Sequence, residues 1–275
     1  MPLHTVSAAY FSATGNTRRI ASTIAQEIAD SLHLPLKHYD FTVPPARKEP
    51  LLFSPDELVV FGTPVYAGRI PNLILPYISA AVGNGAIAVP IVLYGNRAFD
   101  DALMELRNTL EDGGFRTIAA AAFVGEHSFG HDLATDRPDE SDLSLASNFA
   151  KSIVTKLATL DLNMPHIPVP VSGNNPVGPY FRPTDANGNF IDIRKVKPVT
   201  SEDCADCKWC AEHCPMGSIS YEQVSEISGI CIKCNACVKG CPKGAKRFTD
   251  PNYLYHRDDI VARYRTPRKE PSFFL

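Results

Sequence analysis

The sequence has no long apolar run, little net charge, and no cysteine outside residues 204–241. No apolar run in the 275 residues reaches the roughly 18 residues that a membrane-spanning helix needs. The start, M-P-L-H-T-V-S-A-A-Y, lacks the basic segment and apolar core of a secretory signal, so we expect a cytoplasmic protein. The net charge of −3 gives no strong attraction to nucleic acid or to a membrane surface.

All eight cysteines lie in two runs, and each run has the pattern C-x2-C-x2-C-x3-C-P. This spacing resembles the iron–sulfur runs of bacterial two-cluster ferredoxins, in which three cysteines of one run and the fourth of the other hold one cubane cluster. The resemblance implies two 4Fe–4S clusters. The proline after each fourth cysteine fixes φ where the chain crosses between clusters. The implied ligands are Cys204, Cys207, Cys210 and Cys241 for one cluster, and Cys231, Cys234, Cys237 and Cys214 for the other.

Two other uses of these cysteines fit the pattern less well. Zinc sites usually pair two C-x2-C knuckles and have no third cysteine at the next step of three. Disulfides belong mostly to exported chains, whereas free thiols kept for clusters suit a reducing compartment.

Residues 1–160 alternate short apolar runs with helical patterns. Apolar residues recur every four positions from Ile20 to Leu32, as they do on one face of a helix. Strands that alternate with helices predict a parallel α/β sheet. Prolines in 43–57 predict an irregular connection there. We expect strands at 3–11, 36–41, 58–61, 86–94 and 117–124, and further helices near 70–81, 98–112 and 140–160.

A polar loop, S-A-T-G-N-T, separates the first expected strand from the first helix. Its hydroxyls, amide and backbone N–H groups can surround a phosphate at the positive end of the helix. No lysine follows, and the loop is not G-x-G-x-x-G, so it is not a nucleoside triphosphate or dinucleotide motif. It resembles the FMN phosphate loop of flavodoxins; the alternative is an ordinary polar helix cap. The implied phosphate ligands are Ser12, Thr14, Gly15, Asn16 and Thr17.

Two further loops follow the third and fourth expected strands, at the same edge of the sheet. They resemble the flavin-ring loops of flavodoxin-like proteins. Tyr66 would stack on the ring, or would be a surface tyrosine in a Pro/Gly loop. Backbone groups around Gly95 and Asn96 would meet the polar edge of the ring, where glycine permits close approach. The implied ring-binding residues are Thr63, Pro64, Val65, Tyr66, Ala67, Gly68, Tyr94, Gly95, Asn96 and Arg97.

His127 and His131 follow the fifth expected strand, near the same edge. Their spacing invites a metal hypothesis, but the segment looks like a loop and not a helix that presents both rings. We expect a rim that covers the flavin or meets a partner. His127 is a weak candidate for a proton donor to reduced flavin.

Composition divides the rest of the chain. Prolines and glycines crowd residues 161–200, which predicts an extended linker that lies along the first domain or acts as a tether. Residues 201–250 carry the cysteines, and 251–275 form a C-terminal extension expected to pack back onto the protein.

Acids and bases nearly balance in 201–250, whereas many free-standing ferredoxins are markedly acidic. A basic group near the last cysteine would steer an acidic electron carrier towards a cluster, or would form a solvated face. It consists of Lys239, Lys243, Lys246 and Arg247.

Nearly the whole chain resembles flavodoxin–ferredoxin fusion proteins. The resemblance implies a flavodoxin-like doubly wound parallel sheet of order 2-1-3-4-5, a small α+β two-cluster ferredoxin domain, and FMN plus two 4Fe–4S clusters. Electrons would pass between FMN and the clusters in a low-potential redox carrier of anaerobic metabolism, whose partners are other redox proteins. The alternative is a flavin reductase that acts on a small acceptor such as a quinone or a nitro compound.

Overall fold

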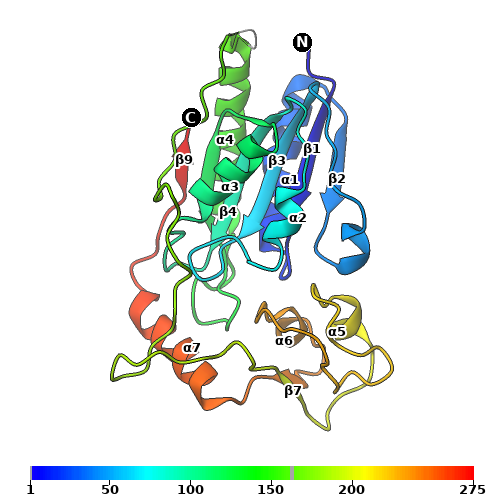
Figure 1. Ribbon diagram of the computed structural model, residues 1–275, viewed down its shortest axis with the longest axis vertical. Helices are drawn as coiled ribbons and strands as arrows, with labels where there is room; N and C mark the ends of the chain where they lie inside the picture. The colour runs from blue at the N-terminus through cyan, green and yellow to red at the C-terminus, as the bar shows by residue number, and fades with distance from the viewer. Residues whose placement is uncertain (1, 162–163) are drawn as a thin grey trace.

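A parallel sheet forms the centre of the molecule, with strands in the order β2-β1-β3-β4-β6 (Figure 1). The structure is a computed structural model that describes residues 2–161 and 164–275. Flavodoxin-like doubly wound sheets have this strand order, so the predicted parallel α/β fold is confirmed. The strands are β1 (Thr5–Tyr10), β2 (Leu36–Asp40), β3 (Glu57–Pro64), β4 (Ile87–Tyr94) and β6 (Ala120–Val124).

Helices cover both faces of the sheet. On one face the apolar stripe of α1, including Ile20 and Ile24, is completely buried and packs with Phe149 of α4. On the other face Leu103 and Leu106 of α3 are completely buried. Full burial of such side chains stabilises the fold by about 1.5–3 kcal/mol each. The helices are α1 (Asn16–Leu32), α2 (Leu75–Ser79), α3 (Ala102–Asp112) and α4 (Glu140–Thr159).

Two expected elements differ in detail. The helix expected at 70–81 shortens to α2, because Pro76 has no N–H to donate and is accepted only in the first turn of a helix. The strand expected at 117–124 divides into β5 (Arg116–Thr117) and β6, which pair with successive parts of β4. The connection at 43–57 contains only a short 3-10 turn, η1 (Pro44–Arg47), as its prolines predicted.

The end of the chain adds an edge strand that sequence patterning did not predict. After α7 (Pro251–Tyr264), β9 (Ser272–Phe274) pairs antiparallel with β6. Phe273 of β9 stacks on Phe149 at 5.1 Å and meets Phe123 edge-on. The cysteine segment is therefore inserted between two strands of one sheet.

The proline-rich segment lies along the sheet domain. Val169 is buried, and its N–H donates to Thr117. The Asp101 carboxylate accepts from the N–H groups of Asn174 and Gly178, both at 2.7 Å. Tyr180 donates its hydroxyl to the carbonyl of Ile70 at 2.8 Å. These bonds hold residues 169–180 against the sheet domain.

The cysteine segment lies below the carboxyl ends of the parallel strands (Figure 1). Its regular elements are short: β7 (Val199–Thr200) pairs antiparallel with β8 (Lys246–Arg247), and α5 (Trp209–Glu212) and α6 (Ala236–Lys239) carry a cysteine each. Among the described residues, no helix has the length and apolar character needed to cross a membrane.

Candidate functional site

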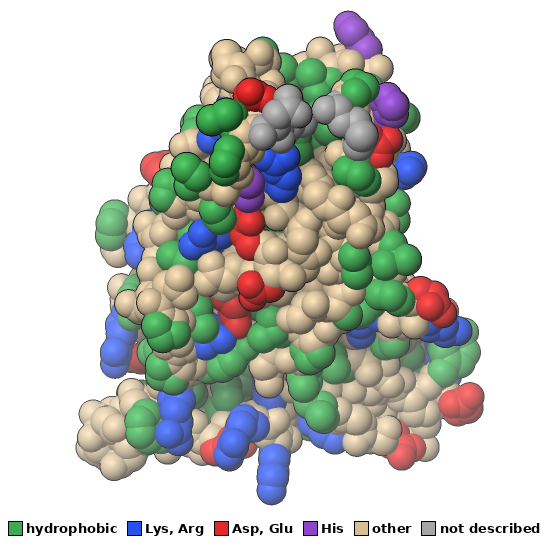
Figure 2. Space-filling model, turned by 45° about the horizontal axis from the view of Figure 1, so that its top comes forward, with side chains coloured by type: hydrophobic (Ala, Val, Ile, Leu, Met, Phe, Trp, Pro, Cys, Tyr) green, Lys and Arg blue, Asp and Glu red, His purple; other side chains and the backbone are tan. Residues whose placement is uncertain are grey.

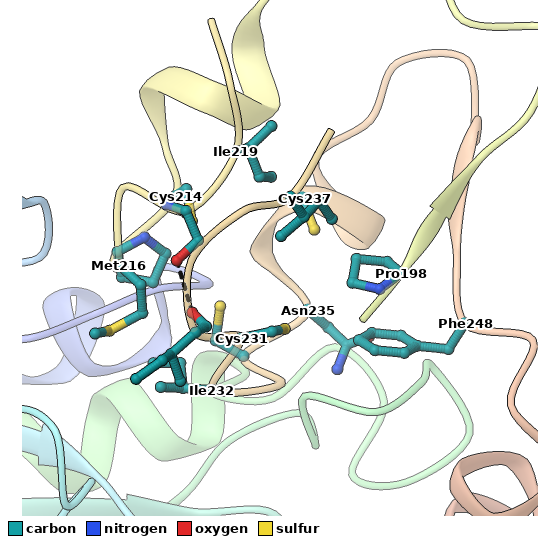
Figure 3. Close-up of a pocket in the computed structure, with 14 residues that line it drawn as sticks. Pro198, Cys214, Met216, Ile219, Cys231, Ile232, Asn235, Cys237 and Phe248 are labelled. Atoms are coloured by element: carbon teal, nitrogen blue, oxygen red, sulfur yellow. Dashed lines mark hydrogen bonds between the residues drawn. The ribbon is translucent and has the colours of Figure 1, made fainter. Parts of the chain in front are cut away.

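The cysteine segment contains two cavities, each lined by four cysteines from both runs. One cavity is lined by Cys207, which is exposed, so we call it the outer cavity. The other, the inner cavity, is drawn in Figure 3. These are the two groups in which the sequence pattern predicted that the cysteines would meet. The outer cavity is lined by Cys204, Cys207, Cys210 and Cys241, and the inner cavity by Cys214, Cys231, Cys234 and Cys237.

Both runs use the same backbone device to turn three cysteines towards one cavity. The residues on either side of the second cysteine are left-handed, with φ of 48° and 63° at Asp206 and Lys208. Lys233 and Asn235 repeat this in the second run, at 56° and 57°. Non-glycine residues seldom adopt this conformation, so the loops depend on their surroundings. The third cysteine then enters α5 or α6.

The fourth cysteine of each run receives a backbone N–H four residues later. Ser218 donates to Cys214 Sγ at 3.4 Å, and Ala245 donates to Cys241 Sγ at 3.2 Å. Burial alone would raise the pKa of Cys241, but backbone N–H groups of residues 243–246 lower it on balance. Such donors stabilise negative charge on sulfur, and they are one means by which proteins tune iron–sulfur centres.

The chemistry of these thiols tests what the cavities can hold. Burial raises the pKa of Cys231, Cys234 and Cys237, that of Cys237 to about 12, so facing thiolates need a cationic centre. In the described residues, no three His, Cys, Asp or Glu side chains are grouped for a single metal ion. A zinc ion needs its sulfurs at about 2.3 Å. Each cavity is lined by four cysteines, which is the number of thiolates that a cubane cluster takes.

The inner cavity lies against the carboxyl edge of the sheet. Two of its lining residues, Met216 and Ile232, pack onto the core that lies between the sheet and α2 and α3. Arg47 donates from Nη2 to the carbonyl of Pro215 at 2.5 Å. Burial and the nearby Cys234 and Cys231 raise the pKa of Tyr66, the ring-loop tyrosine.

The predicted phosphate loop is open to an anion. Gly15 has φ of 90°, and a Cβ added there would meet nothing within 4 Å. Ser12 Oγ accepts from Arg18 N–H at 2.9 Å and caps α1. Within residues 2–161 and 164–275, the N–H groups of Thr14, Asn16 and Thr17 form no hydrogen bond with a protein acceptor. Free N–H groups at a helix N-terminus are the usual ligands of a phosphate.

Some side chains of the phosphate loop are already used. Asn16 donates from Nδ2 to the carbonyl of Glu126 at 3.2 Å, which ties the loop to the segment after β6. Thr17 is buried, and its methyl group packs against Gly62. The backbone of this loop is therefore better placed to bind a phosphate than these two side chains.

The first ring loop is a tight turn. The backbones of Tyr66 and Arg69 exchange two hydrogen bonds, at 2.9 and 3.1 Å. Ala67 and Gly68 between them have φ of 52° and 80°, as a primed two-residue turn requires. Gly68 also lies against Asp100, so a side chain there would collide. The two hydrogen bonds fix the backbone of Tyr66 at the start of the turn.

Several predicted ring-binding residues belong to the packed interior. Thr63 is completely buried, and Val65 donates its N–H to the carbonyl of Leu93 at 2.7 Å. Tyr94 is buried and packs on Phe99 at 5.6 Å. Pro64 ends β3, and Arg97 pairs with Asp100 and covers the Phe181 ring at 4.7 Å. These residues therefore support the ring loops by packing against the interior of the protein.

Asn96 binds the C-terminal tail with its whole side chain. Its Nδ2 donates to the carbonyls of Tyr264 and Pro267, at 2.6 and 3.1 Å, and Oδ1 accepts from Lys269 N–H at 3.0 Å. A flavin would therefore meet backbone groups at this position. Sequence reasoning missed the tail residues, because partners about 170 residues apart leave no local pattern.

His127 packs on the second ring loop in a neutral form. A side chain on Gly95 would collide with its ring. Burial, and then the charge of Lys239, lower the pKa of His127 to about 3. Phe129 N–H donates to Nδ1 at 3.1 Å, so Nε2 carries the proton. His131 instead pairs with Glu126 at 3.0 Å, so the two histidines have separate partners.

Two of the lysines expected to steer a carrier face inwards, which corrects that expectation. Lys239 Nζ pairs with Glu126 at 2.5 Å. Lys246 is buried and donates to Thr200 Oγ1 at 2.6 Å and to the carbonyl of Val224. Lys243 and Arg247 remain exposed. On the face drawn in Figure 2, acidic and basic side chains are interspersed.

Comparisons with known proteins give likenesses to solved structures alone. No family model and no curated protein matches the chain. The chain is similar to a flavodoxin from the domain Archaea, with 15% identity, a TM-score of 0.40, and coverage of 56% of this chain and 99% of that one. For flavodoxin 2 from Bacillus cereus these values are 18%, 0.40, 56% and 99%. For an NADH:FMN oxidoreductase in its apo form they are 18%, 0.39, 55% and 89%. The strand order β2-β1-β3-β4-β6 assigns the fold.

Proposed function

We propose that this chain binds FMN and two 4Fe–4S clusters and passes electrons between them as a low-potential redox carrier. One observation carries the proposal: four cysteines from both runs line each of two cavities, and one cavity adjoins the loops at the carboxyl edge of the sheet. Ligands bind at this edge in doubly wound α/β folds.

The cysteines would hold the clusters in crossed sets. The outer cavity would use Cys204, Cys207, Cys210 and Cys241, and the inner cavity Cys214, Cys231, Cys234 and Cys237. The chain itself excludes water with buried side chains and supplies N–H donors to Cys214 and Cys241. Burial and such donors set the potential of an iron–sulfur centre.

FMN would lie across the carboxyl edge. Open N–H groups of the loop from Ser12 to Thr17 would bind its phosphate without a fixed cation. Tyr66 and the backbone around Gly95 would meet its ring. Clusters exchange one electron at a time and a flavin one or two, so together they convert between single-electron and paired-electron carriers.

Anaerobic purification followed by analysis of iron, sulfide and FMN tests the proposal. Two cubane clusters require about eight iron and eight sulfide per chain, with one FMN. Colourless protein, or zinc in place of iron, would contradict it.

The crossed ligand sets have their own test. Cys214→Ala should damage the inner cluster and spare the outer one, while the matched variant Cys241→Ala should do the reverse. EPR of each reduced variant measures which cluster is lost. The opposite pattern would show that each run holds its own cluster.

His127 favours a second function, reduction of a small acceptor such as a quinone or a nitro compound. Its neutral ring is held beside Gly95, and its Nε2–H would donate a hydrogen bond to a bound acceptor. Steady-state turnover with such acceptors, compared with exchange with other redox proteins, separates an enzyme from a carrier. Unchanged rates in His127→Ala would remove the proton-donor role.

A further inference from the structure

The two cavities differ in their surroundings, and the difference gives them an order in space. The inner cavity touches the sheet domain through Met216 and Ile232, and Cys214 adjoins the Pro215 carbonyl that Arg47 binds. The outer cavity has exposed residues on its rim, among them Cys207 and Pro242.

A nearly buried ion pair keeps the inner cavity in place. Lys239, on α6 next to the inner cysteine Cys237, has a side chain that is 13% exposed and lies 2.5 Å from Glu126, also 13% exposed. Its Nζ also donates to the carbonyl of His127 at 2.7 Å. Because the His127 ring packs on Gly95, this contact joins α6 to the second ring loop.

We infer that the outer cavity is the port at which a one-electron redox protein exchanges electrons, and that the inner cavity is the relay to the flavin edge. The inference rests on the proposed function, because it assigns separate tasks to the two proposed clusters. Its physical basis is that electron transfer slows steeply with separation. Exposed Cys207 gives a docked partner the shorter route to the outer site. The contacts of Lys239 with Glu126 and with the His127 carbonyl bring the inner site to the second ring loop.

EPR in the presence of a soluble gadolinium chelate tests the port. Serine variants Cys207→Ser and Cys234→Ser assign the two cluster signals of the native protein, because serine alters the ligand of one cluster at a time. The outer signal should relax several-fold more strongly than the inner one. Equal relaxation, or stronger relaxation of the inner signal, would overturn the assignment of the port. Absence of two cluster signals in native protein would instead refute the proposed function.

A matched pair of lysine variants tests the relay. Lys239→Met removes the contact with Glu126, and Lys243→Met removes an exposed lysine from the same segment. After photochemical reduction of the clusters, FMN reduction should be roughly tenfold slower in Lys239→Met and unchanged in Lys243→Met, because small misplacements of reacting groups are costly. Both cluster signals should keep their native intensity. Equal FMN reduction rates in the two variants would contradict the relay.

Discussion

The sheet domain and the cysteine segment are stabilised in different ways. The sheet has an apolar core on each face, with many completely buried side chains such as Phe61 and Phe123. The cysteine segment has a much smaller apolar cluster, built on the buried side chains of Cys210, Ile219 and Val224. Units this small usually need metals or disulfides, because they bury too little apolar surface. The sheet domain should therefore fold by burial, and the cysteine segment should depend on its clusters.

The largest expected effect is unfolding of the cysteine segment while the sheet domain stays folded. Removal of iron from the reduced protein by a chelator should abolish amide protection across 199–250, while β1, β3 and β4 stay protected. Hydrogen exchange read by mass spectrometry measures both regions in one sample, and a chelator already saturated with iron is the control. Protection of 199–250 after iron loss would show that this segment folds unaided.

Acid should loosen the contact between the two regions at α7. His256 is buried beside Phe129 and Phe181, and burial lowers its pKa to about 4. The unfolded state takes up a proton first, so stability is complete above pH 6.5 and falls as the pH drops towards 4. The loss is at most about 3 kcal/mol.

Urea unfolding of native protein and His256→Gln at several pH values measures this loss. The variant should have the smaller dependence on pH, and exposed His38→Gln should behave like the native protein. A His256→Gln profile identical to the native one would locate the pH dependence elsewhere.

Loss of the contact between Asn96 and the C-terminal tail should lower the free energy of unfolding by less than acid does. Asn96→Ala leaves the carbonyls of Tyr264 and Pro267 and the N–H of Lys269 without this partner. The free energy of unfolding should fall by about 1–3 kcal/mol, with weaker FMN binding. Asn108→Ala is the control, since Asn108 makes only a long surface hydrogen bond, from its Nδ2 to Asn175 Oδ1 at 3.4 Å. Equal stability of the two variants would mean that the tail does not support the ring loop.

The smallest effect concerns charge near the outer cavity. Glu202 and Glu212 are exposed there, whereas Lys239 and Lys246 are directed inwards. Reduction by the methyl viologen radical cation should slow a few-fold in the double variant Glu202→Lys, Glu212→Lys, and rising salt should reduce the difference. Asp30→Lys, at the far end of α1, should have no effect. Equal rates in all three proteins would exclude electrostatic steering.

Some of the site could be predicted because its pattern is local. Cysteines three residues apart must face one side of a tight loop, and apolar runs such as 58–61 must be buried in a sheet. The connection at 43–57 was correctly predicted to be irregular, because proline removes a donor and fixes φ. Contacts between segments far apart in the chain had no local sequence pattern. Phe273 pairs beside β6, and Lys239 meets Glu126, only after the chain has returned across more than a hundred residues.

The sequence by itself determined the main parallel strands, the four helices that cover the sheet, and the two cysteine runs, because short-range spacing and apolar periodicity control those features. Tertiary structure decided which cavity lies against the sheet, that Asn96 binds the tail, and that two lysines are internal. These features depend on distance in space between segments far apart in the chain. Only packing of the complete chain brings such segments together.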